Sequence, residues 1–303
     1  MKTILMLTLA ICLACATLLP AQNPATPLTL RRSLPLEGPE NAQPSGLTLR
    51  NDTLFTISDK HDTVIFRIEV QDTAAVMIPA ISFRVPGADE KSWFDYEGIT
   101  CDSTGNFYLA SESQFRILRV SADGKAAEWI TPELKSYGAE EGLFQVFNAY
   151  FEGIAWLAPD RFILAAERQP RGFMEVDLAE NPPKIQAQVF QEVKFPFAEG
   201  RFPDFGDLCR YRDDLYLLER NAFVVTRLIE ENGERRQGEG WSYEHVETDP
   251  QWRYSDTRFG LAEGLCMDER FIYIVLDNNG DSRRNNPHDR RPLLFILERP
   301  GGQ

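Results

Sequence analysis

One pattern occurs five times along this chain, and this repetition limits the possible folds more than any other feature of the sequence. Each copy has a small or acidic residue and Gly, a short apolar run, a tight turn, a second apolar run and a closing acidic residue. The copies begin at Ser45, Glu97, Glu152, Asp204 and Glu263, so successive starts are 52, 55, 52 and 59 residues apart. Near-regular spacing of this size indicates a repeat architecture rather than a single wound core.

Each copy has the composition of four short strands. In the second copy, the apolar runs Ile99–Cys101 and Phe107–Ala110 flank a turn whose Gly105 and Asn106 tolerate positive φ. Two further β-like runs follow, and four antiparallel strands are the unit of a propeller blade. The last copy lacks a fourth strand, which the run Leu28–Leu36 could supply. The sequence predicts an all-β, five-bladed β-propeller whose ring is closed by this N-terminal strand joining the last blade; six blades is the alternative.

The first 21 residues have the features of a signal peptide: Lys2, an apolar stretch over Ile4–Leu19 and a small-residue cleavage site at Ala21. Residues 22–303 are expected to form a single domain, since large all-β folds often exceed the usual domain length. No later segment is long and apolar enough to span a bilayer, and a weakly helical stretch is expected only over Pro132–Phe151. We therefore expect an exported protein, periplasmic or extracellular, with a lipid anchor at Cys15 as an alternative.

Charge and cysteine content narrow the possible partners. The chain has 46 acidic and 32 basic residues and a net charge of −14, which argues against nucleic acid or an anionic membrane surface as a partner. Beyond the signal peptide it contains Cys101, Cys209 and Cys266. An odd number cannot pair completely, and we interpret the three as buried free thiols.

Acidic residues recur at two positions of the repeat. One row begins the first strand of each copy and the other ends the second strand. The first row is Glu97, Glu152, Asp204 or Asp207, and Glu263; the second is Asp59, Glu112, Glu167, Glu219 and Asp277. These two positions share one edge of an antiparallel blade, so both rows should converge on one face around a central channel. Each single acid could instead tie blades together through ion pairs, but so many carboxylates in one channel favour bound cations, and oxygen ligands suit Ca²⁺.

Several segments resemble a known family. They are FDYEGITCDSTGNFYLASE from Phe94, NAYFEGIAWLAPDRFILAAERQPRGFMEVDL from Asn148, DLCRYRDDLYLLERNAFVVTRLIEE from Asp207, and GLAEGLCMDERFIYIVLDNN from Gly260. In this order they resemble the phytase-like family described by "esterase-like activity of phytase", over about Ser45 to Glu298. The resemblance implies an exported bacterial β-propeller associated with phosphate-ester hydrolysis, and it assigns no catalytic roles. The chain departs from the pattern at Phe205-Gly206-Asp207, where other copies have Glu-Gly.

Together, the acidic rows and the resemblance predict a metal-dependent phosphoric-ester hydrolase acting on a small anionic or phosphorylated substrate. The residues fall into three predicted roles. The predicted metal ligands are Glu97, Glu152, Glu263 and Asp277; the predicted substrate-binding residues are Arg168, Arg171, Arg220, Lys60 and His61; the predicted general acid or base is Glu167 or Glu219. Metal ions activate water and polarise phosphoryl oxygens, and Arg suits bidentate phosphate contacts.

Two other functions remain open from the sequence. One is a non-catalytic propeller that binds a ligand or a protein through its loop-rich face, because one fold hosts many tasks. The other is a metal-dependent lactonase, for which Asn221 and Asn278 could serve as additional metal ligands. A serine-hydrolase mechanism has no support, since the chain lacks a Gly-x-Ser-x-Gly motif.

Overall fold

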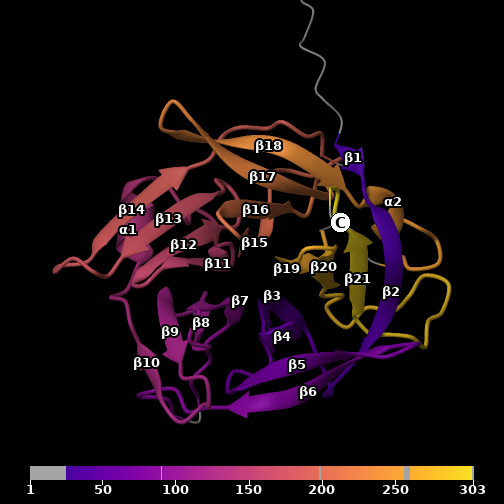
Figure 1. Ribbon diagram of the computed structural model, residues 1–303, viewed down its shortest axis with the longest axis horizontal. Coiled ribbons are helices and arrows are strands. Elements are labelled where there is room, and N and C mark those ends of the chain that lie inside the picture. Colours follow the sequence, from indigo (N-terminus) through magenta and orange to yellow (C-terminus); the bar gives the residue numbers. More distant parts are fainter. Residues whose placement is uncertain (1–24, 90, 198, 256–259, 302–303) are drawn as a thin grey trace, which may run out of the picture.

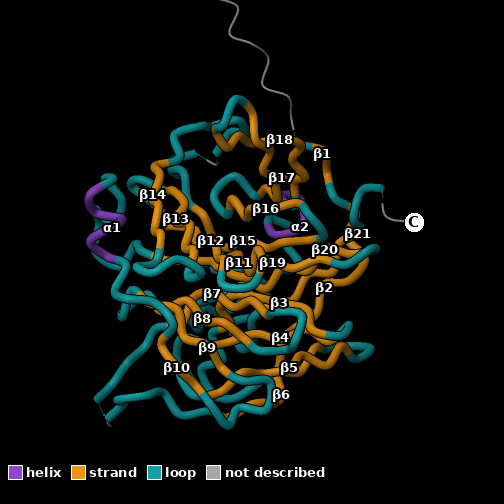
Figure 2. Tube along the Cα trace, turned by 60° about the vertical axis from the view of Figure 1, so that its left-hand side comes forward, coloured by secondary structure: helices purple, strands orange, loops and turns teal. Residues whose placement is uncertain are grey.

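Almost all of the regular secondary structure of this protein consists of strands arranged around a common centre (Figure 1). The computed structural model describes residues 25–89, 91–197, 199–255 and 260–301; the predicted signal peptide lies outside these residues. The prediction of an all-β protein is confirmed. The described helices are α1 (Lys135–Glu140) and α2 (Glu244–Glu247). Figure 2 shows α1 at the periphery and strands throughout the body. None of the described helices is long and apolar enough to cross a membrane.

The strands occupy four radial positions. The inner strands are β3 (Pro44–Arg50), β7 (Tyr96–Cys101), β11 (Phe151–Ala158), β15 (Phe205–Tyr211) and β19 (Ala262–Met267). The second strands are β4 (Thr53–Ser58), β8 (Phe107–Ser111), β12 (Arg161–Ala166), β16 (Asp214–Glu219) and β20 (Phe271–Leu276). The third are β5 (Val64–Val70), β9 (Arg116–Val120), β13 (Gly172–Asp177), β17 (Val224–Glu231) and β21 (Leu293–Glu298). The outer strands are β6 (Ala75–Ser82), β10 (Ala127–Trp129), β14 (Lys184–Val189), β18 (Glu234–Ser242) and β2 (Thr29–Glu37).

Hydrogen bonds join these strands into four sheets. Two contain β7 to β10 and β11 to β14, and a third contains β15 to β18 with the short β1 (Thr26–Pro27) added at its outer edge. The fourth sheet has eight strands in the order β19-β20-β21-β2-β6-β5-β4-β3. Its two halves meet at a two-residue parallel pairing between β2 and β6. The five inner strands contact one another in cyclic order, with β19 against β3.

Glycines allow the inner strands to approach one another closely. A Cβ on Gly98 would lie 2.9 Å from the carbonyl carbon of Gly153, and a Cβ on Gly264 would lie 2.7 Å from that of Gly46. Real Cβ atoms do not tolerate such contacts, so the Gly of each repeat is required by the backbone of the neighbouring inner strand. The recurring Gly of the sequence pattern therefore reflects the packing around the centre.

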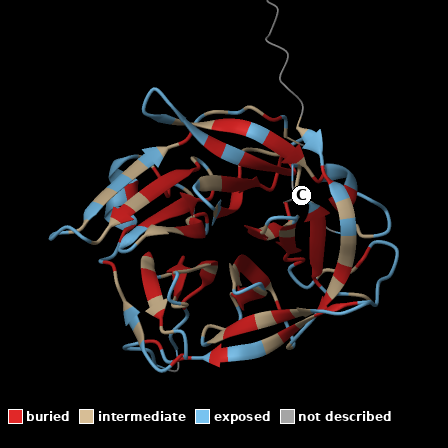
Figure 3. Ribbon diagram, viewed as in Figure 1, coloured by how far each residue is buried: buried red, intermediate tan, exposed pale blue. Residues whose placement is uncertain are grey.

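We call each group of four strands, one from each radial position, a radial set. Apolar side chains fill the spaces between neighbouring radial sets. Ring pairs join them: the centroids of Tyr108 and Phe162 are 4.7 Å apart, and those of Phe173 and Phe205 are 5.3 Å apart. The inner and second strands are largely buried, whereas the outer strands expose alternate residues (Figure 3). Cys209 and Cys266 are buried free thiols, and Cys101 is half-buried and also free. Only six residues of the expected helical stretch form α1, because Phe144 and Phe151 of that stretch pack into a core cluster instead.

The N-terminal segment contacts three consecutive radial sets. β1 pairs parallel with β18, β2 pairs antiparallel with β21, and the end of β2 pairs parallel with β6. Leu34 and Leu36 of β2 are buried in the same core cluster as Leu294 of β21. We call residues 26–37 the N-terminal belt. Its side chains and its backbone hydrogen bonds therefore hold together the first and the last repeats.

We expect Leu34→Ala in the belt to lower the free energy of unfolding by about 2–4 kcal/mol, since the change removes buried methyl groups and leaves a cavity. Arg31→Ala on an exposed position of the same strand is the matched control, with an expected change within about 0.5 kcal/mol. Urea denaturation of both variants measures the difference. Equal stability of the two variants would show that the belt contributes little.

Candidate functional site

β-Bulges aim three of the predicted acids at the centre. The pairing register shifts between Tyr96 and Gly98 in β7, between Phe151 and Gly153 in β11, and between Ala262 and Gly264 in β19. The extra residue at each shift is therefore Glu97, Glu152 or Glu263. Because a bulge redirects the side chain of its extra residue, these carboxylates leave the alternating pattern of their strands. The second acidic row follows at or just after the ends of β4, β8, β12, β16 and β20.

Three carboxylates form a compact group at this face. Asp59 follows β4, Asp95 precedes β7, and Glu97 is the extra residue of the β7 bulge; one ligand oxygen from each lies within 4.8 Å of the others. We call these residues the carboxylate cluster. Lys60 forms an ion pair with the Oδ2 atom of Asp59. The Oδ1 atom of Asp59 is buried and has no hydrogen-bond partner among the described residues.

Burial dominates the electrostatics of the carboxylate cluster. It raises the pKa of Glu97 well above the usual range, and the negative charge of nearby Glu152 adds to the effect. Burial raises the pKa of Asp95 to about 6, despite a side-chain hydrogen bond with Glu112, and raises that of Glu112 to about 8. The Oε1 atom of Glu112 also accepts a 2.8 Å hydrogen bond from the backbone N–H of Tyr150. Without a nearby cation, burial therefore favours the protonated form of these carboxyl groups.

A second group of carboxylates surrounds a buried guanidinium. The Arg220 side chain is 6% exposed and contacts carboxylates from four separate segments of the chain. Its Nε donates to Asp204 Oδ1 at 2.8 Å, and its Nη2 lies 3.5 Å from Glu152 Oε1. It also contacts Glu263 and Glu167. We call this the Arg220 network. Buried charges are stable in a protein only when paired in this way.

Arg171 and Glu219 form a separate buried pair. Both side chains are almost fully buried and in contact, and the guanidinium carbon of Arg171 lies 4.8 Å from the ring centroid of Phe205. Arg168 is more accessible, with 19% of its side chain exposed; it pairs with Glu167 and donates to the carbonyl oxygen of Asn148 at 3.1 Å. Of the three predicted arginines, Arg168 is therefore the one that keeps part of its guanidinium accessible to solvent.

The remaining predicted residues lie in different surroundings. Burial raises the pKa of Asp277 to about 7, and the charge of Asp59 contributes to this shift. The Nε2 atom of His61 lies 3.2 Å from the carbonyl oxygen of Glu40. Asn221 is a ligand in the lactonase hypothesis. Its Nδ2 atom donates a hydrogen bond to Asp204, and its Oδ1 atom accepts one from the backbone N–H of Gly260. Asn278 donates to the carbonyl oxygen of Arg290 at 2.9 Å.

The structure thus divides the predicted metal ligands between two groups. Glu97 lies in the carboxylate cluster, whereas Glu152 and Glu263 contact Arg220. Sequence reasoning did not assign Asp59 or Asp95 as ligands. A signal for Asp95 was present, because it stands two residues before Glu97 at the start of a repeat. Its φ of +51° is a conformation that Asp tolerates better than most residues, and this turn brings its carboxyl group beside Glu97.

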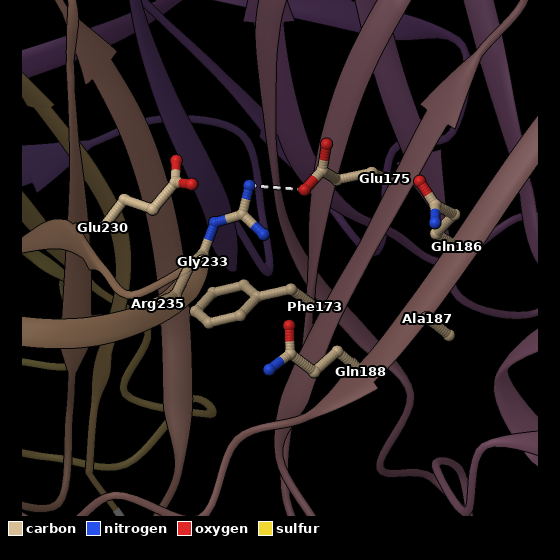
Figure 4. Close-up of a pocket in the computed structure, with 8 residues that line it drawn as sticks. All are labelled: Phe173, Glu175, Gln186, Ala187, Gln188, Glu230, Gly233 and Arg235. Carbon is tan, nitrogen blue, oxygen red and sulfur yellow. Dashed lines mark hydrogen bonds and ion pairs between the residues drawn. The ribbon is translucent and has the colours of Figure 1, made fainter.

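Polar hollows also occur away from this face. A pocket of about 330 Å³ lies between β13, β14 and the β17–β18 hairpin. Figure 4 shows Arg235 in this pocket, paired with Glu175 near the ring of Phe173. Another hollow, of about 200 Å³, is lined by inner-strand residues that include the three cysteines. Burial raises the pKa of Cys209 and Cys266 well above the usual range, so these thiols are protonated and unreactive at neutral pH.

In the presence of a chelator, we expect the free energy of unfolding to fall as the pH rises from about 5 to about 8. Burial raises the folded-state pKa of Asp95 to about 6 and those of Glu112 and Glu152 to about 8. In the unfolded chain, carboxyl groups have a pKa of about 4. The folded protein then holds protons that the unfolded chain has already released, so higher pH favours unfolding. Urea denaturation in EDTA across this range measures the slope; a rise in stability with pH would contradict the assignment.

We expect Arg220→Met to lower the free energy of unfolding by about 3–5 kcal/mol at pH 7, because it leaves four buried carboxylates without their shared cation. The loss should be smaller at pH 5, where these carboxyls can take up protons. Arg227→Met, which removes an exposed ion pair with Asp214, is the control and should cost less than about 1 kcal/mol. A similar loss in both variants would argue against a special role for the Arg220 network.

Solved structures of similar architecture are β-propeller-type proteins. The glutaminyl cyclase of Myxococcus xanthus has a TM-score of 0.54 and 11% sequence identity, over 91% of this chain and 97% of that chain. A virginiamycin B lyase of Staphylococcus aureus has a TM-score of 0.45 and 13% identity, over 88% and 98% of the two chains. The PQQ-bound aldose sugar dehydrogenase of Streptomyces coelicolor has a TM-score of 0.48 and 12% identity, over 92% and 99%. The first of these supports a propeller-like fold.

Sequence comparison adds the family. No curated protein matches the chain. The family model described as "Phytase-like: Esterase-like activity of phytase" matches residues 42–280, which include the carboxylate cluster and the Arg220 network. This match agrees with the resemblance found in the repeats. The chain belongs to the phytase-like family.

Proposed function

We propose that this protein is an exported, metal-dependent phosphoric-ester hydrolase whose reaction centre is the carboxylate cluster. One observation carries the proposal: ligand oxygens of Asp59, Asp95 and Glu97 lie within 4.8 Å of one another. Membership of a family described by esterase-like activity supports the reaction class. The position of the cluster at the face where the acidic rows meet supports access by a small anionic substrate.

The residues of the cluster fit a hard divalent cation. All three ligands are carboxylates, which suit Ca²⁺ or Mg²⁺ better than soft metals. The buried Oδ1 atom of Asp59 has no partner among the described residues, and neither does that of nearby Asp62. We propose Ca²⁺ as the ion, with Asp277 and Glu152 close enough to add negative charge. A bound cation would supply Lewis-acid polarisation of the substrate and an activated water.

Two cationic side chains would orient the substrate. Lys60 pairs with Asp59, and 46% of its side chain is exposed, so a substrate can reach its ammonium group. Arg168 is near enough to Glu112 for its charge to lower the pKa of that carboxyl group, and part of its side chain is accessible. We propose that these two hold the anionic oxygens of the substrate. Arg220 and Arg171 have carboxylate partners in the described structure, so we propose that they, with Glu167 and Glu219, fix the shape of the site.

The finer features of the fold belong to the same proposal. We propose that the five radial sets are the five blades of one propeller, that β2 closes the ring as the outer strand of the last blade, and that residues 22–303 form one domain. The pairing of β2 with β21 and the cyclic contacts of the inner strands support this count. We also propose export through the 21-residue leader; a lipid anchor at Cys15 stays the alternative.

An assay with three substrates tests the reaction class. Hydrolysis of p-nitrophenyl phosphate or inositol hexakisphosphate, dependent on added Ca²⁺ and lost in EDTA, is the expected result. Turnover of a simple lactone alone would favour the lactonase alternative. No turnover of any of the three would favour a propeller that only binds its ligand.

We expect Asp95→Asn to reduce phosphatase activity at least about 100-fold, because it removes one ligand from the metal, and to abolish the increase in melting temperature that Ca²⁺ gives the unaltered protein. Asp89→Asn is the matched control, an exposed acid in the same loop that lies outside the cluster. Melting curves with and without Ca²⁺ separate metal binding from catalysis. Full activity of Asp95→Asn with normal Ca²⁺ stabilisation would refute the proposed reaction centre.

A further inference from the structure

A cavity of mixed polar and apolar lining opens on the same face as the carboxylate cluster. It has a volume of about 540 Å³ and lies between two loops, residues 38–43 before β3 and residues 278–292 between β20 and β21. Both loops join the strand ends that carry the acidic rows, so the cavity belongs to the same face. The loop after β20, yellow in Figure 1, runs beside β2. Asn278 lines the cavity and directly follows Asp277.

Internal hydrogen bonds hold the longer loop in place. Arg283 is 3% exposed and donates to the carbonyl oxygens of Trp252 at 2.7 Å and Arg291 at 3.0 Å. The Tyr254 hydroxyl donates to the same carbonyl oxygen of Arg291 at 2.6 Å. Asn278 Nδ2 donates to the carbonyl oxygen of Arg290 at 2.9 Å. The backbone that carries the cavity-lining side chains is therefore pre-organised, which reduces the entropy cost of binding.

Two side chains that line the cavity, those of Arg290 and His288, have no partner among the described residues. Arg291 forms ion pairs with Asp289 and Glu37, with N–O distances of 2.8 and 3.1 Å. In contrast, the guanidinium of Arg290 and the ring of His288 make no hydrogen bond or ion pair with any described residue. The guanidinium of Arg290 is exposed at the wall of the cavity. It provides a site for an anionic group.

The rest of the polar lining favours hydroxyl groups. Residues with side-chain amides line the cavity from both loops: Asn41, Gln43, Asn278 and Asn286. The Nδ2 atom of Asn278 already donates to the carbonyl oxygens of Asp281 and Arg290, so this residue offers its amide oxygen as an acceptor. An amide offers both donors and acceptors, and a sugar hydroxyl likewise donates and accepts. The apolar part of the lining consists of Leu36, Ala42 and Gly and Pro residues. The cavity therefore offers both polar and apolar groups, which suits a ligand that carries hydroxyl groups on an aliphatic ring.

We propose that this cavity is a binding site for an acidic sugar, whose hydroxyls bond the amides and whose carboxylate pairs with Arg290. A volume of about 540 Å³ is within the range of small-ligand sites and accommodates a mono- or disaccharide. The site goes beyond the proposed hydrolase activity, because its ligand needs neither a metal ion nor a reaction. Its loops adjoin residues near the proposed reaction centre: the carbonyl oxygen of Glu40 lies 3.2 Å from the Nε2 atom of His61, and Asn278 directly follows Asp277.

Calorimetric titration with D-glucuronate, D-glucose and acetate tests this site, in EDTA and at moderate salt. Glucuronate has both hydroxyls and a carboxylate, whereas each of the other two probes has one of them. We expect glucuronate to bind more tightly than either. Arg290→Gln should weaken glucuronate binding about tenfold, the size expected for one charged hydrogen bond, and leave glucose binding unchanged.

Arg284→Gln is the matched control. Arg284 is exposed, belongs to the same loop and does not line the cavity, so its loss should not change glucuronate binding. An equal effect of both variants would indicate general attraction by charge, and glucuronate binding no tighter than that of acetate would show that the hydroxyls are not recognised. Binding that required Ca²⁺ would place the carboxylate at the cluster. Each of these results would overturn the proposal, and none of them depends on hydrolysis.

Discussion

The contact between Arg220 and four carboxylates is the interaction on which the centre of this protein depends. Glu152 and Glu167 belong to one repeat, whereas Asp204 and Glu263 belong to the two that follow, and the close approach of the inner strands brings their side chains together. Without a shared cation, their mutual repulsion and the cost of their burial would oppose that approach. Arg220 makes the approach possible on one side of the centre. On the other side, Asp59 of the carboxylate cluster forms an ion pair with Lys60. The two groups of carboxylates thus differ in how basic side chains compensate their charge, and this difference distinguishes the candidate metal site from the structural ion-pair network around Arg220.

Much of the architecture could be predicted from the sequence, because repetition constrains many residues at once. The spacing of the Glu-Gly copies, their apolar runs and the N-terminal run Leu28–Leu36 gave the strands, and β2 (Thr29–Glu37) pairs with β21. The gathering of acids at one face followed from counting strand ends. The helical expectation over Pro132–Phe151 was mostly wrong, since aromatic residues of that stretch serve the core and only α1 is helical.

The division of the acids into two groups could not be predicted, because it depends on which carboxylate the long side chain of Arg220 reaches. Arg220 follows the Leu-Leu-Glu motif of one repeat and contacts residues as far away in sequence as Glu152. The repeat pattern treats Glu97, Glu152 and Glu263 as equivalents, and their bulges are equivalent too. Asp95 escaped notice because it lies outside the repeated positions and joins the cluster only through its left-handed backbone conformation.

The N-terminal belt has a consequence for how this protein can be attached to anything else. It pairs with the outer strands β18 and β6 and with β21, the third strand of the last repeat, so residue 26 lies at the circumference of the ring of strands and not on the surface that bears the acids. A fused partner, an affinity tag or a surface used for immobilisation would hold the molecule by its side. The opening at the centre would then stay facing the solvent, in whichever orientation the molecule is displayed.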